Sequence, residues 1–187
     1  MGANFTIISI NCFGGRIYQD LKLPYTSPTA GLFFFFDDYV EFVENFDDYI
    51  KRDIKIIEKS KWDTGEDNVK KYTFDYPIGQ IVGTSIEVHF LHYDSADEAI
   101  SKWYRRRDRI TNNKIFIAFN QNLPNFESAE RFLKLPRTIL FSTVPMPKFS
   151  NCIYIKELKN YTEAPDPYVY SRTYYKHLAK YFKSIQK

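Results

Sequence analysis

Short apolar runs alternate with amphipathic stretches along most of the chain. The apolar or alternating runs predict β-strands at residues 5–10, 32–36, 54–57, 69–82, 85–91, 114–119, 138–141 and 151–155. Helical spacing of apolar side chains predicts helices at residues 16–21, 37–51, 95–110, 128–135 and 172–184. Strands separated by helices indicate parallel pairing, and residues 69–91 leave room for an antiparallel hairpin. We therefore expect an α/β fold, a three-layer sandwich with a mixed, mostly parallel sheet flanked by helices.

Two of the predicted helices carry clear boundary signals. Asp37 and Asp38 stand at the start of one and Lys51 stands at its end, the distribution that the helix dipole favours. Ser95 is followed three residues later by Glu98, which is the sequence of a capping box. These signals make the helices at 37–51 and 95–110 the best-defined elements of the pattern.

Composition and length narrow the class of protein. The chain has 187 residues, 18% of them aromatic, and a net charge of +3. High aromatic content favours a packed protein, and no repeat or low-complexity linker divides the chain, so we expect a single α/β domain over residues 1–187. The start lacks a signal-peptide pattern, and no apolar run reaches the roughly 18 residues of a membrane-spanning helix. With only two cysteines, the chain is expected to be cytoplasmic.

Polar side chains follow several predicted strands, where ligands bind in α/β sheets. These side chains are Asn11, Cys12, Asp37, Asp38, His92, Tyr93, Asn120 and Ser142. We expect a single sheet edge to carry Asn11, Cys12, His92 and Tyr93.

Cys12 and His92 are the candidate catalytic residues. Cys12 stands between a strand and a helix start, where backbone N–H groups stabilise a thiolate, and a histidine partner would make it a nucleophile. The alternative is that Cys12 is a small buried residue in a tight turn. His89 and His92 are three positions apart on a strand and point to opposite faces, so no metal site is expected there.

Two further short motifs have a functional and a structural reading. Gly14 and Gly15 could let a phosphate approach the backbone at a helix N-terminus, or they could form a simple turn. Asp37 and Asp38 could hold Mg²⁺ with a sugar nucleotide, or they could serve only the start of their helix.

Basic residues are concentrated on two predicted helices. The helix after Ser95 carries Arg105, Arg106 and Arg109 opposite its apolar stripe, where they could bind a phosphate or carboxylate or lie in solvent. The second is a C-terminal basic aromatic helix at about 171–185, with every charged side chain of residues 168–187 basic. Its aromatic face could rest on a membrane or dock on the sheet.

Several short segments follow one another in a recognisable order. They are Asn11-Cys12-Phe13-Gly14-Gly15, residues 23–29, Gly31-Leu32-Phe33, Tyr76-Pro77-Ile78-Gly79, His89-Phe90-Leu91-His92-Tyr93 and residues 98–110. Over about residues 5–155 they resemble a bacterial family of unknown function whose members are usually labelled exopolysaccharide biosynthesis proteins. Phe13 stands where the family often has Trp, and Thr111 where Asn is common. The resemblance implies a role in surface-polysaccharide assembly and supplies no catalytic residues.

The resemblance and the candidate residues together lead to three hypotheses. The first is a transferase of exopolysaccharide or capsule biosynthesis that acts on an anionic activated sugar or lipid-linked saccharide. In it, His92 is the acid/base, Arg105, Arg106 and Arg109 hold phosphate, and Asn11, Gly14, Gly15, Tyr93 and Asn120 complete the ligand site. The second is a non-catalytic accessory protein that binds a saccharide intermediate or a partner enzyme of the pathway. The third is an acyl-transfer enzyme with a Cys12–His92 pair. No cofactor is identified, and nucleic acid is not expected as a partner. A weak peripheral contact with the inner membrane face is one of the two readings of the C-terminal helix, and docking on the sheet is the other.

Overall fold

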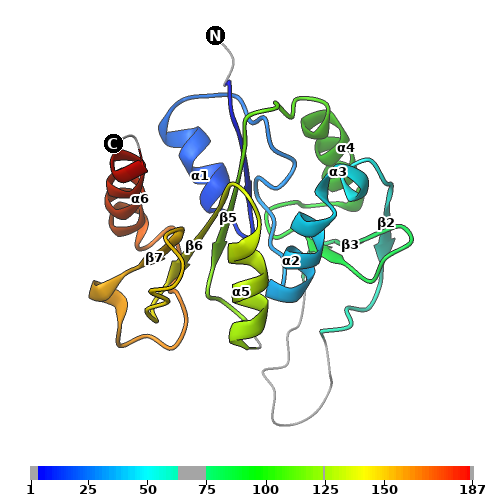
Figure 1. Cartoon of the computed structure of the whole chain (residues 1–187). Helices are drawn as coiled ribbons and strands as arrows, with labels where there is room; N and C mark the ends of the chain where they lie inside the picture. Colours follow the sequence, from blue (N-terminus) through cyan, green and yellow to red (C-terminus); the bar gives the residue numbers. More distant parts are fainter. Residues whose placement is uncertain (1–3, 63–74, 124, 186–187) are drawn as a thin grey trace.

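The protein contains two β-sheets with helices around them (Figure 1). The computed structural model describes residues 4–62, 75–123 and 125–185. The strands are β1 (Thr6–Ser9), β2 (Ile54–Ile57), β3 (Ile78–Ile81), β4 (Glu87–His89), β5 (Lys114–Phe119), β6 (Thr138–Ser142) and β7 (Cys152–Tyr154). The helices are α1 (Phe13–Asp20), α2 (Phe36–Glu44), α3 (Phe46–Tyr49), α4 (Ala96–Arg107), α5 (Phe126–Lys134), the 3-10 helix η1 (Lys156–Leu158) and α6 (Ser171–Ile185).

The larger sheet is parallel and has the order β1-β5-β6-β7. Its strands are buried along nearly their whole length, because helices cover both faces. On one face, Phe13 of α1 packs edge-on against Phe119 and Phe141. On the other face, the Tyr39 hydroxyl of α2 donates to the Ile8 carbonyl oxygen at 2.7 Å. The sheet thus forms the middle of three layers, with α1 and α6 on one side and α2 and α5 on the other (Figure 1).

The smaller sheet is antiparallel, with the order β2-β3-β4. It joins the large sheet through the backbone near Phe33 and Phe34. Phe33 forms an isolated antiparallel bridge with His89, the last residue of β4, while the Phe34 amide donates to the Ile10 carbonyl just after β1. The end of β4 is therefore held close to the end of β1, which brings the two sheets together at one place.

The expected α/β class is confirmed, and its parallel and antiparallel parts form separate sheets. The expected strand at 32–36 is wrong, because the segment makes only the Phe33 bridge before α2 begins at Phe36. The helix expected at 37–51 is divided at Asn45, whose φ of −114° is not helical. The part of the expected strand at 69–74 lies outside the described residues.

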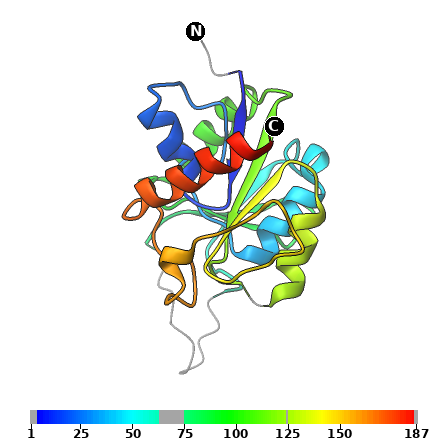
Figure 2. The ribbon, with the colours of Figure 1, turned by 60° about the vertical axis from the view of Figure 1, so that its left-hand side comes forward.

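The C-terminal helix α6 lies across the same face of the large sheet as α1 (Figure 2). Tyr174 is fully buried there, with its ring 4.9 Å from that of Phe119, and Leu178 is also buried. The lysines Lys176 and Lys180 are exposed. The helix therefore docks on the sheet through its apolar face, which is the second of the two readings of its sequence.

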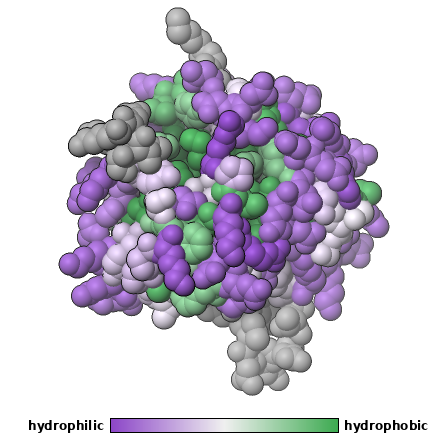
Figure 3. Space-filling model, viewed as in Figure 1, coloured by the Kyte–Doolittle hydropathy of each residue, from purple (hydrophilic) through white to green (hydrophobic). Residues whose placement is uncertain are grey.

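The molecular face seen in Figure 3 is mostly hydrophilic, with apolar side chains showing in patches between polar ones. Among the described residues, no helix combines the length and the apolar composition needed to span a membrane.

Candidate functional site

A cleft of about 860 Å³ opens at the carboxyl ends of β1 and β5. This is where the strand pattern led us to expect a ligand site. The cleft is lined by Asn11, Cys12, Gly15, Gln19, Tyr25, Ala30, Gly31, Phe33, Leu91, His92, Tyr93, Lys102, Arg106, Gln121, Asn122, Glu163, Asp166, Pro167 and Tyr168. It thus collects residues from the segments that follow strands of both sheets, from α1 and α4, and from the segment before α6.

Cys12 and His92 meet in this cleft. The Cys12 sulfur lies 3.1 Å from Nε2 of His92, although 80 positions separate the two residues in sequence. Cys12 directly precedes α1, whereas His92 follows β4, so the joining of the two sheets brings them together. The sequence placed both residues at strand ends; the structure shows that His92 comes from the small antiparallel sheet rather than from the edge of the parallel one.

The surroundings of Cys12 hold it as a neutral thiol. Burial raises the pKa of the thiol to about 12, and the negative charge of Asp166 adds to the rise. The sulfur also lies 3.8 Å from the carbonyl oxygen of Leu32, to which it can donate. At neutral pH the thiol therefore retains its proton and depends on His92 to accept it.

A tight local backbone holds His92 over the cleft. The His92 amide donates to the Gly31 carbonyl at 3.2 Å. Gly31 has a φ of +84°, and a Cβ there would lie 3.3 Å from the Tyr93 ring, so a larger residue would be both strained and crowded. The Tyr93 hydroxyl donates to the Ala30 carbonyl at 2.7 Å, which ties the turn after β4 to the segment before α2.

Arg106 brings a buried positive charge to the cleft. Its Nη1 donates to the Ala30 carbonyl at 2.8 Å and to the Tyr93 hydroxyl at 2.5 Å. Its guanidinium lies 4.6 Å from the centre of the Tyr25 ring, in cation–π geometry. No described carboxylate forms an ion pair with Arg106, whereas its neighbour Lys102 pairs with Glu98.

A chain of side-chain amides connects the floor of the cleft to its wall. Asn11 accepts from the Phe13 amide at 3.1 Å and donates to Gln121 Oε1 at 2.8 Å. Gln121 in turn donates to the Ala164 carbonyl at 2.7 Å. This chain fixes the start of α1, the end of β5 and the segment that carries Asp166 relative to one another.

Several of the predicted ligand-binding residues do not line the cleft. Gly14 is buried where α1 crosses β1: a Cβ there would lie 2.9 Å from Cβ of Ser9. Asn120 uses its amide on Thr143, donating to the hydroxyl at 2.9 Å and accepting from the backbone N–H at 3.2 Å. Arg105 and Arg109 are exposed outside the cleft.

The helical positions of the arginines explain this difference. The sequence pattern placed Arg106 on the polar side of α4 with Arg105 and Arg109, but Arg106 is 8% exposed and turned toward the cleft. The next residue, Arg107, lies over the Tyr104 ring. The buried side of α4 is therefore rotated toward Arg106, because its neighbours Tyr25 and Tyr93 accept a guanidinium.

The residues that the sequence pattern did not single out lie mostly in loops. They are Tyr25, Lys102, Gln121, Glu163, Asp166 and Tyr168. None of them follows a predicted strand directly except Gln121, which comes after Asn120. The position of Gln121, one residue beyond a strand end, is the signal that could have identified it.

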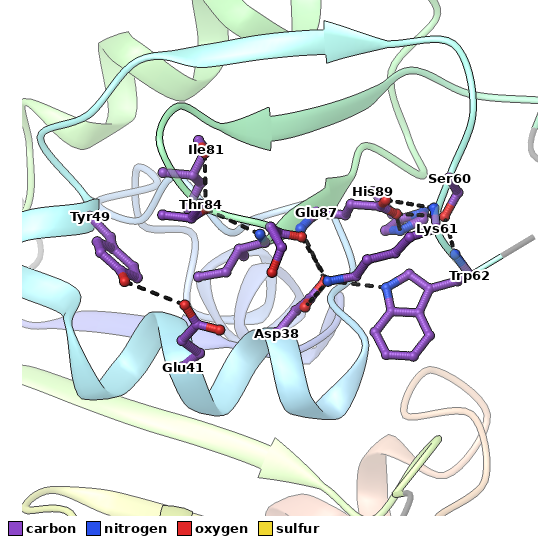
Figure 4. A network of polar contacts seen from close by, with 12 residues as sticks. Asp38, Glu41, Tyr49, Ser60, Lys61, Trp62, Ile81, Thr84, Glu87 and His89 are labelled. Carbon is purple, nitrogen blue, oxygen red and sulfur yellow. Dashed lines mark hydrogen bonds and ion pairs between the residues drawn. The ribbon is translucent and has the colours of Figure 1, made fainter.

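Asp37 and Asp38 lie on α2 and do not line this cleft. Figure 4 shows Asp38 with its polar contacts. Asp38 accepts from Lys61 Nζ at 2.5 Å, from Trp62 Nε1 at 3.2 Å and from the Glu87 amide at 3.0 Å. Burial raises the pKa of Asp38 against the opposing effect of these donors. Asp37 accepts from Ser128 at 2.6 Å. In the described part of the chain, no three His, Cys, Asp or Glu side chains gather as a metal site.

His89 belongs to the same buried network. Its Nε2 lies 3.3 Å from Oε2 of Glu87, and its ring packs against Phe33 and Phe35. It is fully buried. Its role is therefore structural, and His92 is the histidine of the cleft.

Comparison with known proteins places the chain in a family without a known reaction. A family model described as "Domain of unknown function (DUF1919)" matches residues 1–186. An "Uncharacterized protein" of Haemophilus influenzae (strain ATCC 51907 / DSM 11121 / KW20 / Rd) is 28% identical over 169 residues, which cover 89% of this chain and 75% of that protein. Neither description names an activity, and neither supports the expected link to exopolysaccharide biosynthesis. Because the family model spans nearly the whole chain, the protein belongs to the DUF1919 family.

Proposed function

We propose that this protein is a transferase in which Cys12 is the nucleophile and His92 is its general base. The observation that carries this proposal is the 3.1 Å distance between the Cys12 sulfur and His92 Nε2 within a large cleft. A nucleophile within hydrogen-bond reach of a base is the arrangement that covalent acyl transfer requires. It favours acyl transfer over glycosyl transfer, which needs no thiol.

The raised pKa of Cys12 determines how the pair would work. With a pKa of about 12, the thiol is not a preformed thiolate. His92 therefore takes the proton while the sulfur attacks, as the histidine of a serine hydrolase does. In that role the neutral imidazole carries its proton on Nδ1 and presents Nε2 to the sulfur. The Phe13 amide already donates to Asn11, so the Gly15 amide, at a cleft-lining position in the first turn of α1, is the one that can stabilise the oxyanion developing on the acyl carbonyl.

The basic side of the cleft supports an anionic substrate. Arg106 is buried without a described carboxylate partner, and Lys102, which pairs with Glu98, stands one helical turn before it. Guanidinium binds phosphate and carboxylate groups strongly when water is excluded. We therefore retain the expectation of an anionic ligand and assign it to Arg106 and Lys102, in place of Arg105 and Arg109.

We further propose that the substrate is an activated sugar or a lipid-linked saccharide of exopolysaccharide or capsule assembly. The support for this pathway is the sequence resemblance described above. The cleft agrees with it in chemistry, since the aromatic rings of Tyr25 and Tyr168 and the amides of Asn11 and Gln121 suit a polar ring compound. The protein would then work in the cytoplasm, and its exposed Lys176 and Lys180 could give weak electrostatic contact with the inner membrane face.

A non-catalytic protein that binds a saccharide or a pathway enzyme is the second candidate. The observation that favours it is the state of Cys12, which is 7% exposed and carries a raised pKa. A cysteine without a catalytic role in a binding cleft would have the same low exposure and the same raised pKa.

Covalent labelling by an activated ester separates the two candidates. The protein is incubated with p-nitrophenyl acetate, and the intact chain and its peptides are weighed by mass spectrometry. The transferase proposal predicts one acetyl group on Cys12, and none at that peptide in the Cys12→Ser variant. Cys152, which is half-buried and whose burial raises its pKa to about 11, serves as the internal control. Acetylation of Cys152 and surface lysines without Cys12 would contradict the proposal.

A further inference from the structure

The cleft has walls of opposite charge. Helix α4 contributes Lys102, which pairs with Glu98, and Arg106, which has no described ion-pair partner; the segment before α6 contributes Glu163 and Asp166. In Figure 1, α1 lies between α4 and α6, and Cys12 stands at the start of α1. The catalytic pair thus stands in a cleft that is basic along one element and acidic along another.

Asp166 of the acidic wall lies within electrostatic range of the nucleophile. Asp166 contributes to the raised pKa of Cys12, so its charge is felt at the sulfur. Its Oδ1 accepts from the backbone amides of Tyr168 at 2.6 Å and Val169 at 3.4 Å, which fixes the carboxylate in place. Neither Glu163 nor Asp166 forms an ion pair with another described residue. A negative charge near a thiol hinders thiolate formation, so Asp166 does not activate Cys12. We therefore look for its role in binding a ligand.

Aromatic rings stand beside both walls. Tyr168 and Phe33 line the cleft with Tyr25 and Tyr93, and Tyr168 lies near enough to Cys12 to be affected by its charge. Ring faces attract cations, and they attract them more strongly where water is excluded. The Tyr168 ring already faces Arg16 at 5.4 Å, and the Tyr25 ring already faces Arg106. The carboxylates of Glu163 and Asp166 are therefore the groups that can hold an ammonium group, while Arg106 on the other side can hold an anion.

We propose that the acceptor of the transferred acyl group is a zwitterion, a small molecule with a primary amine and a phosphate or carboxylate. This inference rests on the proposed acyl-transfer function and gives it a substrate class. The amine lies at Asp166 and Glu163, close to Cys12, and the anionic group lies at Arg106 and Lys102.

The two half-reactions balance with an activated ester or thioester as acyl donor. In the first, the Cys12 sulfur bonds to the carbonyl carbon, the bond to the leaving group breaks, and the thiol proton passes through His92 to that group. In the second, the acceptor ammonium releases one proton to water, and its nitrogen lone pair attacks the thioester carbon. The C–N bond forms, the C–S bond breaks, and its electron pair returns to sulfur. His92 carries the second proton from nitrogen to sulfur, which leaves an amide and the free thiol.

Three related probe compounds test this substrate class. They are glucosamine 6-phosphate, glucosamine, which lacks the phosphate, and glucose 6-phosphate, which lacks the amine. The protein is first acetylated with p-nitrophenyl acetate, and the loss of the acetyl group from Cys12 is followed by intact mass. We expect glucosamine 6-phosphate to discharge the acetyl group at least about tenfold faster than either of the others, since each lacks one charged contact.

Charge-neutral variants locate the two contacts. In the double variant Glu163→Gln with Asp166→Asn, glucosamine 6-phosphate should no longer discharge the acetyl group faster than glucose 6-phosphate. In Lys102→Gln, its rate advantage over glucosamine should be smaller. Glu58→Gln is the matched control, because Glu58 is exposed and does not line the cleft. Equal discharge by all three compounds overturns the proposal, and so does preferred discharge by glucose 6-phosphate, which would make the acceptor a hydroxyl.

Equilibrium binding separates this inference from the acyl-transfer proposal itself. The same compounds are titrated calorimetrically into the Cys12→Ser variant, which cannot form a thioester. If acetylation of the parent fails but glucosamine 6-phosphate binds about tenfold more tightly than both others, the acyl-transfer proposal fails and the zwitterion site stands. Equal binding, or none, overturns the zwitterion site in either case.

Discussion

At the residue scale, the chemistry of the cleft depends on how tightly Cys12 keeps its proton. Burial is the main cause of its raised pKa, and Asp166 adds to it. A neutral thiol 3.1 Å from an imidazole can react when His92 accepts the proton during attack, and it resists reaction otherwise. A cysteine that is 7% exposed can in this way serve a substrate bound beside it without being a preformed thiolate.

The Asp166→Asn substitution should speed the alkylation of Cys12. Removing the negative charge lowers the pKa of the thiol, so a larger fraction is thiolate at any mildly alkaline pH. We expect the rate with iodoacetamide to rise several-fold at Cys12 and to stay unchanged at Cys152, as measured by peptide mass spectrometry. An unchanged rate at Cys12 would mean that Asp166 does not act on the sulfur.

Single residues could be predicted from the sequence only where a strand end fixed their position. Cys12 and His92 were identified in this way, and they meet in the cleft. Arg106 was placed on the wrong side of its helix, because the rings that enclose it come from Tyr25, far away in sequence, and from Tyr93. Asp166 was missed, because nothing near it in sequence shows that its loop returns to Cys12.

At the element scale, the position of α1 depends on a close contact with β1. A Cβ on Gly14 would lie 2.9 Å from Cβ of Ser9 and 3.1 Å from Cγ2 of Ile7, so the helix could not stay where it is. A Cβ on Gly15 would lie 3.5 Å from the nearest atoms, which is ordinary contact. The two adjacent glycines therefore play different roles, and only Gly14 is required by packing.

Gly14→Ala and Gly15→Ala form a matched pair of variants. Gly14→Ala should destabilise the fold by about 1–3 kcal/mol through overpacking. Gly15→Ala should be neutral or stabilising by up to about 1 kcal/mol, because alanine is the better helix former. Urea unfolding measures both. Similar free energies of unfolding for the two variants would contradict the packing of α1 on β1.

The buried network on α2 and β4 holds the small sheet to the helices (Figure 4). Glu87 accepts from Ser60 at 2.5 Å and from the Lys61 amide at 2.7 Å, and lies 3.3 Å from His89. Burial alone would raise the pKa of Glu87, but the hydrogen bonds from His89, Lys61 and Ser60 together hold it below its ordinary value of 4.5. Glu87 therefore contributes stability above pH 4.5, and this contribution is lost as the pH falls through the lowered pKa.

Glu87→Gln should remove this contribution. We expect a loss of about 1–3 kcal/mol at neutral pH, with a smaller dependence of stability on pH below the ordinary pKa of glutamate. Glu58→Gln makes the same change at an exposed position just after β2 and should alter stability by less than about 0.5 kcal/mol. Thermal unfolding across the acid range measures both. A pH dependence equal to that of the parent would rule out this role of Glu87.

The elements themselves followed well from local patterns. The strand at Lys114–Phe119 and the cap of α4 by Ser95, which accepts from the Glu98 amide at 3.2 Å, agree with the prediction. Residues 32–36 did not, because an apolar run fits a buried connection between sheets as well as a strand. Periodicity describes burial, and only the paired backbone decides which buried segment becomes a strand.

At the scale of the whole molecule, the docking of α6 limits how the protein could touch a membrane. Tyr174 and Leu178 are buried against the sheet and are not free to enter lipid. Any contact would rest on the exposed lysines, each contributing about 1 kcal/mol near an anionic surface. Such contact would be reversible and sensitive to salt.

Reversing two of these charges tests the membrane proposal. Lys176→Glu with Lys180→Glu should reduce co-sedimentation with vesicles of phosphatidylglycerol and phosphatidylcholine by at least about tenfold. Lys55→Glu with Lys59→Glu gives the same net charge through exposed positions elsewhere, and it should reduce co-sedimentation less. Equal loss in both double variants would show that only net charge matters, and α6 would then have no special role.

The overall architecture was predictable, whereas the meeting of the two sheets was not. Alternating strands and helices indicated the α/β class, and the carboxyl ends of strands indicated the position of the cleft. The contact that completes the cleft depends on the Phe33–His89 bridge and the Phe34–Ile10 hydrogen bond. These are single backbone contacts between distant segments, and no local pattern specifies them.

The central claim is that His92 acts on Cys12, and the His92→Ala variant tests it most directly. The first turnover with p-nitrophenyl acetate is followed by release of p-nitrophenol, with circular dichroism and thermal unfolding confirming that the variant folds like the parent. Because general-base catalysis by a positioned histidine typically contributes about 10²- to 10⁴-fold, we predict a loss of that size in the acylation rate of Cys12. A His92→Ala variant that acylates Cys12 as fast as the parent would contradict the account.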